Sequence, residues 1–342
     1  MADLVSILLS TRNRQSLLKR ALLSLRSQTY RALEILVLDD GSTDATPDFL
    51  ERIAQQDPRV RWLRREQSRG LASALNALIA KSRGNWLARM DDDDIAHPQR
   101  IARQLAYMQE KELDVCGTWF RRVAGWRRSI ARPAVEHGRI LGELLFQPPL
   151  LHPSVMFRRT VFERFGGYSE TAPHAEDYEL WVRLMGHVRF GNCPEILMDY
   201  TLSPAQVSRH YNAKQVETAR SLRIRALAQL AIRHTPAQAA IHAQLRDPSP
   251  IRTLDELERI HDWLLTLFPQ LHPEAQTAVQ RQWFLQCVRA AGLGPVVFQR
   301  FRSSPLAKVG AGQQGALWVL CKSRLKYRSR LFNQLEPLAK IG

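Results

Sequence analysis

Two clusters of carboxylates in this sequence have the composition and the position to do chemistry: Asp39-Asp40 and the run from Asp91 to Asp94. Each follows a short apolar run and precedes a segment of helical periodicity, so each is expected at a strand-to-helix turn. In open α/β sheets, ligands bind beyond the carboxyl ends of the strands, which is where both clusters would lie. The alternative is that such residues only cap helices and solvate loops, which would account for Asp44 and for Asp94.

The run of four carboxylates predicts a metal-bound, phosphorylated ligand. Like charges this close repel one another, and a divalent cation would relieve the repulsion. Ligands made only of oxygen select hard ions such as Mg²⁺ or Mn²⁺, which keep coordination positions open for phosphate oxygens. The sequence contains no G-x-x-x-x-G-K-[ST], and its one G-x-G-x-x-G, over residues 310–315, follows no strand pattern, so a P-loop enzyme and a dinucleotide dehydrogenase are disfavoured.

The elements that must position these carboxylates can be read from the hydrophobic pattern. Residues 1–212 alternate apolar runs of strand length with helices of 3.6 periodicity, the pattern of an α/β fold with a mainly parallel sheet flanked by helices. A helix is expected after the first acidic cluster, with Thr46 as its N-cap and Pro47 at its first position. Strands are expected over residues 4–10, 33–38, 60–63, 86–90, 115–123 and 154–157. Beyond residue 212 strand patterns disappear, so residues 213–342 are expected to form a separate α-helical domain.

Composition narrows the class of protein further. The chain has 342 residues, of which 45% are hydrophobic, enough for a sizeable buried core. No stretch reaches 18 consecutive apolar residues, and the four cysteines are far apart without metal-ligand spacing. A membrane-spanning helix, secretion, structural zinc and a disulfide framework are therefore disfavoured, and a cytoplasmic location is expected.

The two acidic clusters belong to a longer series of short motifs along residues 3–212. The series comprises residues 5–7, 13–14, 37–44, 74–76, 84–94, 152–157, 166–168 and 176–177, with Gly70 before the fourth of these. In order and spacing it resembles the family 2 glycosyltransferases, which have the Rossmann-like GT-A fold and are typical of bacterial surface-polysaccharide and lipopolysaccharide assembly. No transmembrane helices and no Q-x-x-R-W element accompany the series, so transfer of one sugar per encounter is expected rather than processive synthesis.

The resemblance implies roles for individual residues. Asp40 corresponds to the carboxylate that hydrogen-bonds the nucleotide base, and Asp91 and Asp93 match the outer positions of the D-x-D element. Asp93 would bind Mn²⁺ or Mg²⁺, with Asp91 near the ribose or the waters of the metal, and His210 lies where some relatives supply a further ligand. The nucleotide-sugar site is expected to include Ser10, Arg12, Asp39, Asp40, Asn76, Asp91 and Asp92. Arg12 departs from the family, since relatives often carry an aromatic residue there that stacks on uracil.

Asp177 matches the catalytic base of the family, with Glu176 beside it. In an inverting transfer an acceptor hydroxyl attacks the anomeric carbon while a nucleoside diphosphate leaves from the opposite face. One carboxylate must take the proton of the hydroxyl, and a separate group must neutralise the leaving diphosphate. The alternative is that Asp177 only caps a helix, because the macrodipole favours a carboxylate there. Trp181 is expected in the core, and His152 is expected to be a structural histidine.

The second half is strongly basic. Residues 213–342 hold 19 basic and 8 acidic side chains, and the formal charge of the whole chain is +16. Residues 316–332 combine apolar residues with lysines and arginines, a pattern that predicts peripheral binding to an anionic membrane surface on the inner face of the plasma membrane. A solvated helical face is the alternative explanation. A nucleic-acid binder is unlikely, because it needs a basic groove with exposed aromatic residues and the first half carries acidic clusters instead.

The predicted activity is therefore metal-dependent, inverting transfer of a single sugar from a nucleotide-sugar donor to a hydroxyl of a glycan or lipid-linked acceptor. A metal-dependent nucleotidyltransferase or phosphotransferase shares the aspartate clusters and remains an alternative, although it needs no base at the distance of Glu176-Asp177. The products separate the two, because one releases a nucleoside diphosphate and the other pyrophosphate.

Overall fold

The computed structural model describes residues 3–172, 174–202, 213–308 and 311–323. The chain divides into two compact units. The first consists of Met1–Ile140 and Pro148–Thr218, and the second of Leu141–Gln147 and Ala219–Gly342. Among the described residues, no helix combines the length and the apolar character needed to cross a bilayer.

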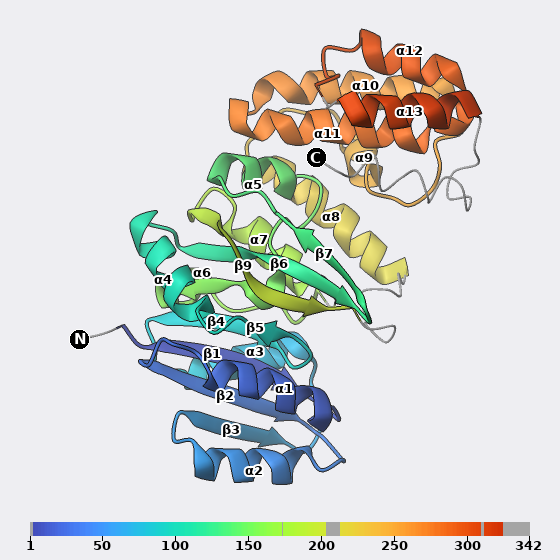
Figure 1. Cartoon of the computed structure of the whole chain (residues 1–342). Coiled ribbons are helices and arrows are strands. Elements are labelled where there is room, and N and C mark those ends of the chain that lie inside the picture. Colours follow the sequence, from blue (N-terminus) through green and yellow to red (C-terminus); the bar gives the residue numbers. More distant parts are fainter. Residues whose placement is uncertain (1–2, 173, 203–212, 309–310, 324–342) are drawn as a thin grey trace. The chain divides into compact units, whose positions relative to one another are not determined.

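The first unit begins with four parallel strands joined by helices. Strands β1 (Val5–Thr11), β2 (Leu33–Asp40), β3 (Val60–Arg65) and β4 (Trp86–Asp91) lie in the order β3-β2-β1-β4. The connections run through α1 (Gln15–Arg26), α2 (Thr46–Gln56) and α3 (Leu71–Lys81) (Figure 1). In this register Ser10 lies opposite Leu38 of β2 and Asp91 of β4. The carboxyl ends of β1, β2 and β4 therefore meet at one edge of the sheet.

The sheet continues beyond β4 with strands of both directions. The order there is β4-β8-β6-β9-β5, formed by β8 (Met156–Arg158), β6 (Val115–Ala124), β9 (Phe190–Thr201) and β5 (Ile95–Ala96), while β7 (Arg127–Ala131) pairs with β6. Strand β8 is antiparallel to both of its neighbours, whereas β6 and β9 are parallel. The remaining helices that accompany these strands are α4 (Arg100–Glu110), α5 (His137–Leu144), α6 (Arg159–Phe165) and α7 (Glu176–Leu184). The expected α/β class, a mainly parallel sheet flanked by helices, is confirmed.

Alternation along the central strands explains this layering. Ile7 and Leu9 of β1 and Ile35 and Val37 of β2 belong to the core cluster that contains Leu18, Leu22 and Leu25 of α1. Because side chains of a strand alternate between the two faces, every second residue of β1 and β2 packs under this helix. All eight residues of β2 are buried, as a central strand covered on both faces requires.

The start of α2 differs from the prediction in its cap. Ala45 occupies the N-cap position, and Thr46 is the first helical residue. The carboxylate of Asp44 accepts a hydrogen bond from the backbone N–H of Thr46 at 3.0 Å. Asp44 thus satisfies one of the unpaired donors at the start of the helix, the N–H of Thr46 itself, and Thr46 is not the cap.

The described part of the second unit is helical. It contains α8 (Ala213–Gln229) from residue 219 onward, α9 (Pro236–Gln244), α10 (Leu254–Leu267), α11 (Pro273–Arg289), α12 (Pro295–Ser303) and α13 (Ala311–Ser323). Thr235 opens α9 with a capping box to Gln238, followed by Pro236 at the first position. The aromatic side chains of Trp263, Trp283 and Phe301 are almost fully buried in this unit.

Candidate active site

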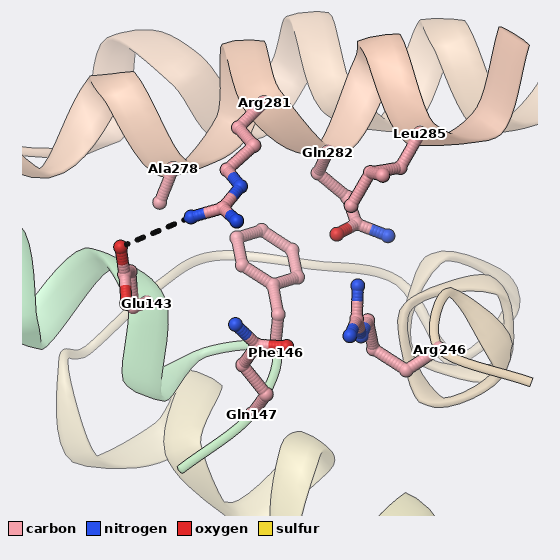
Figure 2. A pocket seen from close by; sticks show the side chains of 8 residues that line it. All are labelled: Glu143, Phe146, Gln147, Arg246, Ala278, Arg281, Gln282 and Leu285. Carbon is pink, nitrogen blue, oxygen red and sulfur yellow. Dashed lines mark ion pairs between the residues drawn. The ribbon is translucent and has the colours of Figure 1, made fainter. Parts of the chain in front are cut away.

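A cavity lies in each unit, and the two differ greatly in size. A space of about 20 Å³ in the second unit lies around Phe146, Arg246 and Gln282, beside the ion pair of Glu143 and Arg281 (Figure 2). It has room for about one water molecule. The other cavity has a volume of about 750 Å³ and lies in the first unit, at the carboxyl ends of β1, β2 and β4. The larger cavity is the candidate active site.

Most of the site residues expected from the sequence line this cavity. They are Ser10, Arg12, Asp40, Asp91, Asp92, Asp93, Glu176 and Asp177. Ser10 and Asp91 are neighbours in the register of β1 and β4, Asp40 ends β2, and Asp177 belongs to the first turn of α7. Residues more than a hundred positions apart therefore face one space. His210 lies outside the described residues.

The acidic turn after β4 brings three carboxylates together. Oxygens of Asp91, Asp93 and Asp94 lie within 4.8 Å of one another. Burial, followed by the charges of Asp91 and Asp92, raises the pKa of Asp93 to about 6. Burial and the nearby Asp91 also raise the pKa of Asp94 well above its usual range. Concentrated negative charge of this kind is costly unless a cation or protons compensate for it.

Asp94 is neither a helix cap nor a solvated loop residue, the two roles considered for it from the sequence. It is fully buried, and α4 begins only at Arg100, so it does not cap that helix. One oxygen accepts a hydrogen bond from the backbone N–H of Thr201 at 2.8 Å, while Oδ2 has no hydrogen-bond partner among the described residues. A buried carboxylate oxygen without a donor, beside two further carboxylates, fits a divalent cation with oxygen ligands. Asp94 is thus a candidate ligand, and the alternative by which it only caps a helix or solvates a loop does not hold.

The other three carboxylates of the turn have cationic partners, and that of Asp93 is Arg14 at 3.5 Å. Arg89 of β4 is almost fully buried and holds Asp91 with two contacts, at 2.5 and 2.9 Å. Asp92 accepts hydrogen bonds from Thr11 Oγ1 at 2.7 Å and from Arg14 at 3.1 Å. Arg89 also lines the cavity. Its position two residues before Asp91 in a strand, on the same face, is the signal that could have identified it.

Asp40 and Asp39 have separate tasks at the end of β2. Asp40 accepts hydrogen bonds from Ser68 Oγ at 2.6 Å and from the backbone N–H of Gly70 at 3.2 Å, and it also lies on the cavity wall. Asp39 is fully buried, is not among the lining residues, and accepts the backbone N–H of Ser42 at 3.0 Å. Asp40 thus faces the cavity, whereas Asp39 closes the turn behind it.

Asn76 is also absent from the lining of the cavity. Its side chain spans two distant segments: it donates to the backbone carbonyl of Tyr168 at 2.9 Å and accepts the backbone N–H of Tyr168 at 2.8 Å. A Cβ atom placed on Gly167 would lie only 2.2 Å from Asn76 Oδ1, so the glycine permits this approach. The position of Asn76 is explained by this bond between α3 and the segment that precedes α7.

We expect Asn76→Ala to lower the free energy of unfolding by about 2 kcal/mol, since two hydrogen bonds are worth about 1 kcal/mol each. Chemical denaturation measures this change. Donor affinity, measured at low temperature where the variant stays folded, should remain within about twofold of the wild type, because sites without shared partners act independently. Gln56→Ala, exposed on α2, is the control and should change stability by less than about 0.5 kcal/mol. A large loss of donor affinity without a loss of stability would instead place Asn76 at the donor.

Asp177 and Glu176 open α7 on the wall of the cavity. Ala175 is the N-cap, and Asp177 Oδ1 accepts the backbone N–H of Tyr178 at 2.7 Å. Burial, and then the charge of Glu176, raises the pKa of Asp177 to about 6. A carboxylate with a pKa close to the working pH can accept a proton and release it again, which suits a general base.

His152 and Trp181 pack behind Asp177. Trp181 is fully buried, as predicted. Nε2 of His152 lies 2.9 Å from the hydroxyl of Tyr168, and burial lowers the pKa of the imidazole well below its usual range. The imidazole is therefore neutral and satisfied by a protein partner, as expected for a structural histidine, although it also contributes to the cavity wall.

Comparison with known proteins decides the family. Residues 6–166 match the family model of glycosyl transferase family 2. An uncharacterized glycosyltransferase of Haemophilus influenzae is 30% identical over 237 residues, which are 64% of this chain and 72% of that protein. The chain belongs to glycosyl transferase family 2. The expectation of a glycosyltransferase is therefore confirmed.

Two further relatives of this glycosyltransferase come from Escherichia coli. The O-antigen biosynthesis glycosyltransferase WbnJ is 27% identical over 58% of this chain and 80% of its own length. The UDP-Glc:alpha-D-GlcNAc-diphosphoundecaprenol beta-1,3-glucosyltransferase WfaP is 25% identical over 54% of this chain and 70% of its own length.

Solved structures share the fold of the glycosyltransferase. TarS 1–349 of S. aureus in complex with UDP-GlcNAc has a TM-score of 0.55 and 15% identity, over 98% of this chain and 90% of that one. The chain spans only 52% of the longer TarS structure. The mannosyltransferase PcManGT of Pyrobaculum calidifontis, in complex with GDP-Man and Mn²⁺, has a TM-score of 0.52 and 19% identity, over 98% and 84%. These likenesses confirm the expected GT-A fold class.

Proposed function

We propose that this glycosyltransferase moves a single sugar, with inversion, from a nucleotide-sugar donor to a hydroxyl of a glycan or lipid-linked acceptor in surface-polysaccharide assembly. One observation carries the proposal: Asp177 on α7 and the acidic turn after β4 line the same cavity but come from different elements. An inverting transfer needs its base and its leaving-group site as separate groups. The UDP-GlcNAc complex of TarS and the lipid-linked acceptor in the name of WfaP support the choice of substrates.

The acidic turn would hold a divalent cation through Asp91, Asp93 and Asp94. Their clustered oxygens fit such an ion, as does Oδ2 of Asp94, which no described residue hydrogen-bonds, and the Mn²⁺ complex of PcManGT supports it. A bound Mn²⁺ or Mg²⁺ supplies Lewis-acid neutralisation of the departing diphosphate. The protein's own part is to fix the carboxylates: Arg89 holds Asp91, and the N–H of Thr201 holds Asp94. His210 stays a predicted further ligand.

The remaining residues of the cavity bind and orient the donor and the acceptor. Asp40, Ser10 and Arg12 surround the position proposed for the nucleotide, and Asp40 has a fixed orientation because Ser68 and Gly70 donate to it. Asp177 takes the proton of the acceptor hydroxyl as the hydroxyl oxygen bonds to the anomeric carbon and the bond from that carbon to the diphosphate oxygen of the donor breaks. Burial, and then the charge of Glu176, raise the pKa of Asp177, which makes it a stronger base. The enzyme would work in the cytoplasm at the inner face of the membrane, where a lipid-linked acceptor is available.

A panel of nucleotide sugars with Mn²⁺ or Mg²⁺ tests the proposal. UDP-, GDP- and dTDP-sugars are incubated with the full chain and a lipid-linked oligosaccharide fraction, and the released nucleotide and the anomeric configuration of the product are determined. Release of a nucleoside diphosphate with inverted configuration is expected for one donor class. Pyrophosphate release would favour the nucleotidyltransferase alternative, and a retained configuration would remove the inverting mechanism.

We expect kcat/KM to fall as the pH drops through about 6. Protonated Asp177 cannot accept the hydroxyl proton, and its pKa is raised to about 6, so activity is present above this pH and lost below it. Each further pH unit should cost about tenfold. Initial rates at saturating metal measure the profile. Donor affinity is measured at each pH as the control, since Asp93 titrates in the same range. A profile that is flat between pH 5 and 7 would contradict the assignment of Asp177.

A further inference from the structure

Residues 119–132, here called the basic hairpin, carry five arginines and no acidic side chain. They comprise the end of β6, the turn at Gly125 and Trp126, and the whole of β7 (Figure 1). The arginines are Arg121, Arg122, Arg127, Arg128 and Arg132. The proposed transfer chemistry does not use these arginines.

The arginines of the basic hairpin are available to a partner. Arg121 pairs with Asp199 at 3.5 Å, but among the described residues the other four have no acidic partner within ion-pair distance. Arg122, Arg127, Arg128 and Arg132 are all exposed. Cross-strand pairing puts Arg128 beside Val123 on one face and Arg127 beside Ala124 on the other. Positive charge thus lies on both faces of the hairpin.

The tip of the basic hairpin is apolar and exposed. Gly125 has a φ of 59°, which suits the first position of a two-residue hairpin turn. Trp126 follows it, and the side chain of Trp126 is 85% exposed to solvent. Ile130 of β7 is 47% exposed. Among the described residues of the first unit, the large hydrophobic side chains exposed to this degree are these two and Leu23 of α1.

The basic hairpin lies at the end of the sheet that holds the cavity. Strand β6 is parallel to β9, with Arg122 opposite Tyr200 and Val123 opposite Thr201. Tyr200 lines the cavity, and the N–H of Thr201 binds Asp94 of the acidic turn. The turn at Gly125-Trp126 therefore extends beyond the same edge at which the donor cavity opens.

We propose that the basic hairpin binds an anionic phospholipid bilayer, with Trp126 at the membrane interface and the arginines on the headgroups. Tryptophan is favoured at the level of the headgroups, and each arginine close to an anionic surface strengthens binding. Charge complementarity identifies the partner: an exposed aromatic tip between two arginine-bearing faces suits a surface that is apolar inside and negatively charged outside. Binding of this kind would present the cavity edge to an acceptor carried by the membrane.

Sedimentation of the full chain with vesicles tests this inference without donor or acceptor, so its outcome is independent of the proposed activity. Vesicles of phosphatidylcholine alone are compared with vesicles that contain 30% phosphatidylglycerol. The wild-type chain should partition into the anionic vesicles and much less into the neutral ones, with binding that weakens as salt is added. Equal partition into both kinds of vesicle would overturn the proposal.

Charge reversal in the hairpin locates the binding surface. Arg127→Glu/Arg128→Glu should weaken partition into anionic vesicles by about 30-fold or more, since two favourable arginine contacts are lost. Arg20→Glu/Arg52→Glu on α1 and α2 makes the same change in net charge at exposed positions and should bind nearly as the wild type does. Equal loss in both variants, or in neither, would overturn the proposal, because both keep residues 316–332 intact.

Two further variants separate a bilayer from a specific protein or nucleic acid. Arg127→Lys/Arg128→Lys keeps the charge and should keep vesicle binding, whereas loss of binding would indicate a partner that reads guanidinium geometry. Trp126→Ala should weaken partition several-fold and leave its salt dependence unchanged, with Leu23→Ala on α1 as the control for an exposed apolar side chain. Unchanged partition of Trp126→Ala would remove the tip from the interface and contradict the proposal.

Discussion

Asp177→Asn is expected to reduce sugar transfer by about 1,000-fold, the range that a general base contributes, while donor binding persists. Asparagine has nearly the same shape and can keep the contact with the backbone of Tyr178, but it cannot take a proton from the acceptor. Steady-state rates of nucleoside diphosphate release measure the loss. Calorimetric titration with the donor and metal should give an affinity within about threefold of the wild type, since the change is isosteric.

The matched control for this variant is Asp48→Asn. Asp48 is an exposed carboxylate in the first turn of α2, as Asp177 is in the first turn of α7. Both substitutions remove one favourable interaction with a helix macrodipole, which is worth about 0.3–1 kcal/mol. If Asp177 only stabilised its helix, the two variants would behave alike. An active Asp177→Asn enzyme would refute the assignment of the base.

Asp93→Ala is expected to abolish the metal dependence of donor binding. Its carboxylate lies in the acidic cluster with Asp91 and Asp94 and is almost fully buried. Donor affinity in the presence of Mn²⁺ should fall by about 100-fold or more, as the loss of a direct charge contact of about 3 kcal/mol implies. Titration with donor at several metal concentrations measures this. Asp199→Ala serves as the control, since Asp199 is a carboxylate of β9 that pairs with Arg121 of β6.

The same substitution should stabilise the metal-free protein. The folded state raises the pKa of Asp93 to about 6, so at pH 7 its charged form weakens folding, by about 3 kcal/mol on the usual relation between pKa and free energy. This penalty is present above pH 6 and disappears as the pH falls below the ordinary pKa of aspartate. Thermal unfolding without metal should show a higher Tm for Asp93→Ala, and added Mn²⁺ should stabilise only the wild type. A lower Tm in metal-free buffer would contradict the account of like-charge repulsion.

The sequence predicts the acidic turns because two separate signals agree there. A buried strand ends, and a polar turn opens a helix, at Asp40 and at Asp91, so the register of parallel strands alone brings both to one edge of the sheet. The nearness of Asp177 could be expected only through the family resemblance. It depends on how α7 packs against β8 and β9, where Trp181 meets Phe157 and Phe190, and no local pattern in residues 170–180 encodes that packing.

Other features were not predicted, for physical reasons that can be named. Strand β9 contains Pro194 next to a shift in its pairing with β6, and this interrupts the alternation by which a strand is recognised. Strand β7 exposes four of its five residues, so it has almost no hydrophobic pattern. Asn76 sits in a motif of the family, but its two hydrogen bonds reach across 92 positions of sequence. Asp94 shows that a carboxylate in a charged run can be the most deeply buried member.

The loop after β3 depends on Asp40 for its shape. One carboxylate receives the hydroxyl of Ser68 and the main-chain amides of Arg69 and Gly70, so removing it would release three donors at once. Anyone who wishes to redesign the enzyme for another nucleobase would therefore leave this aspartate in place. Exchanges at Arg12 would alter the proposed nucleotide site and spare the backbone that Asp40 holds.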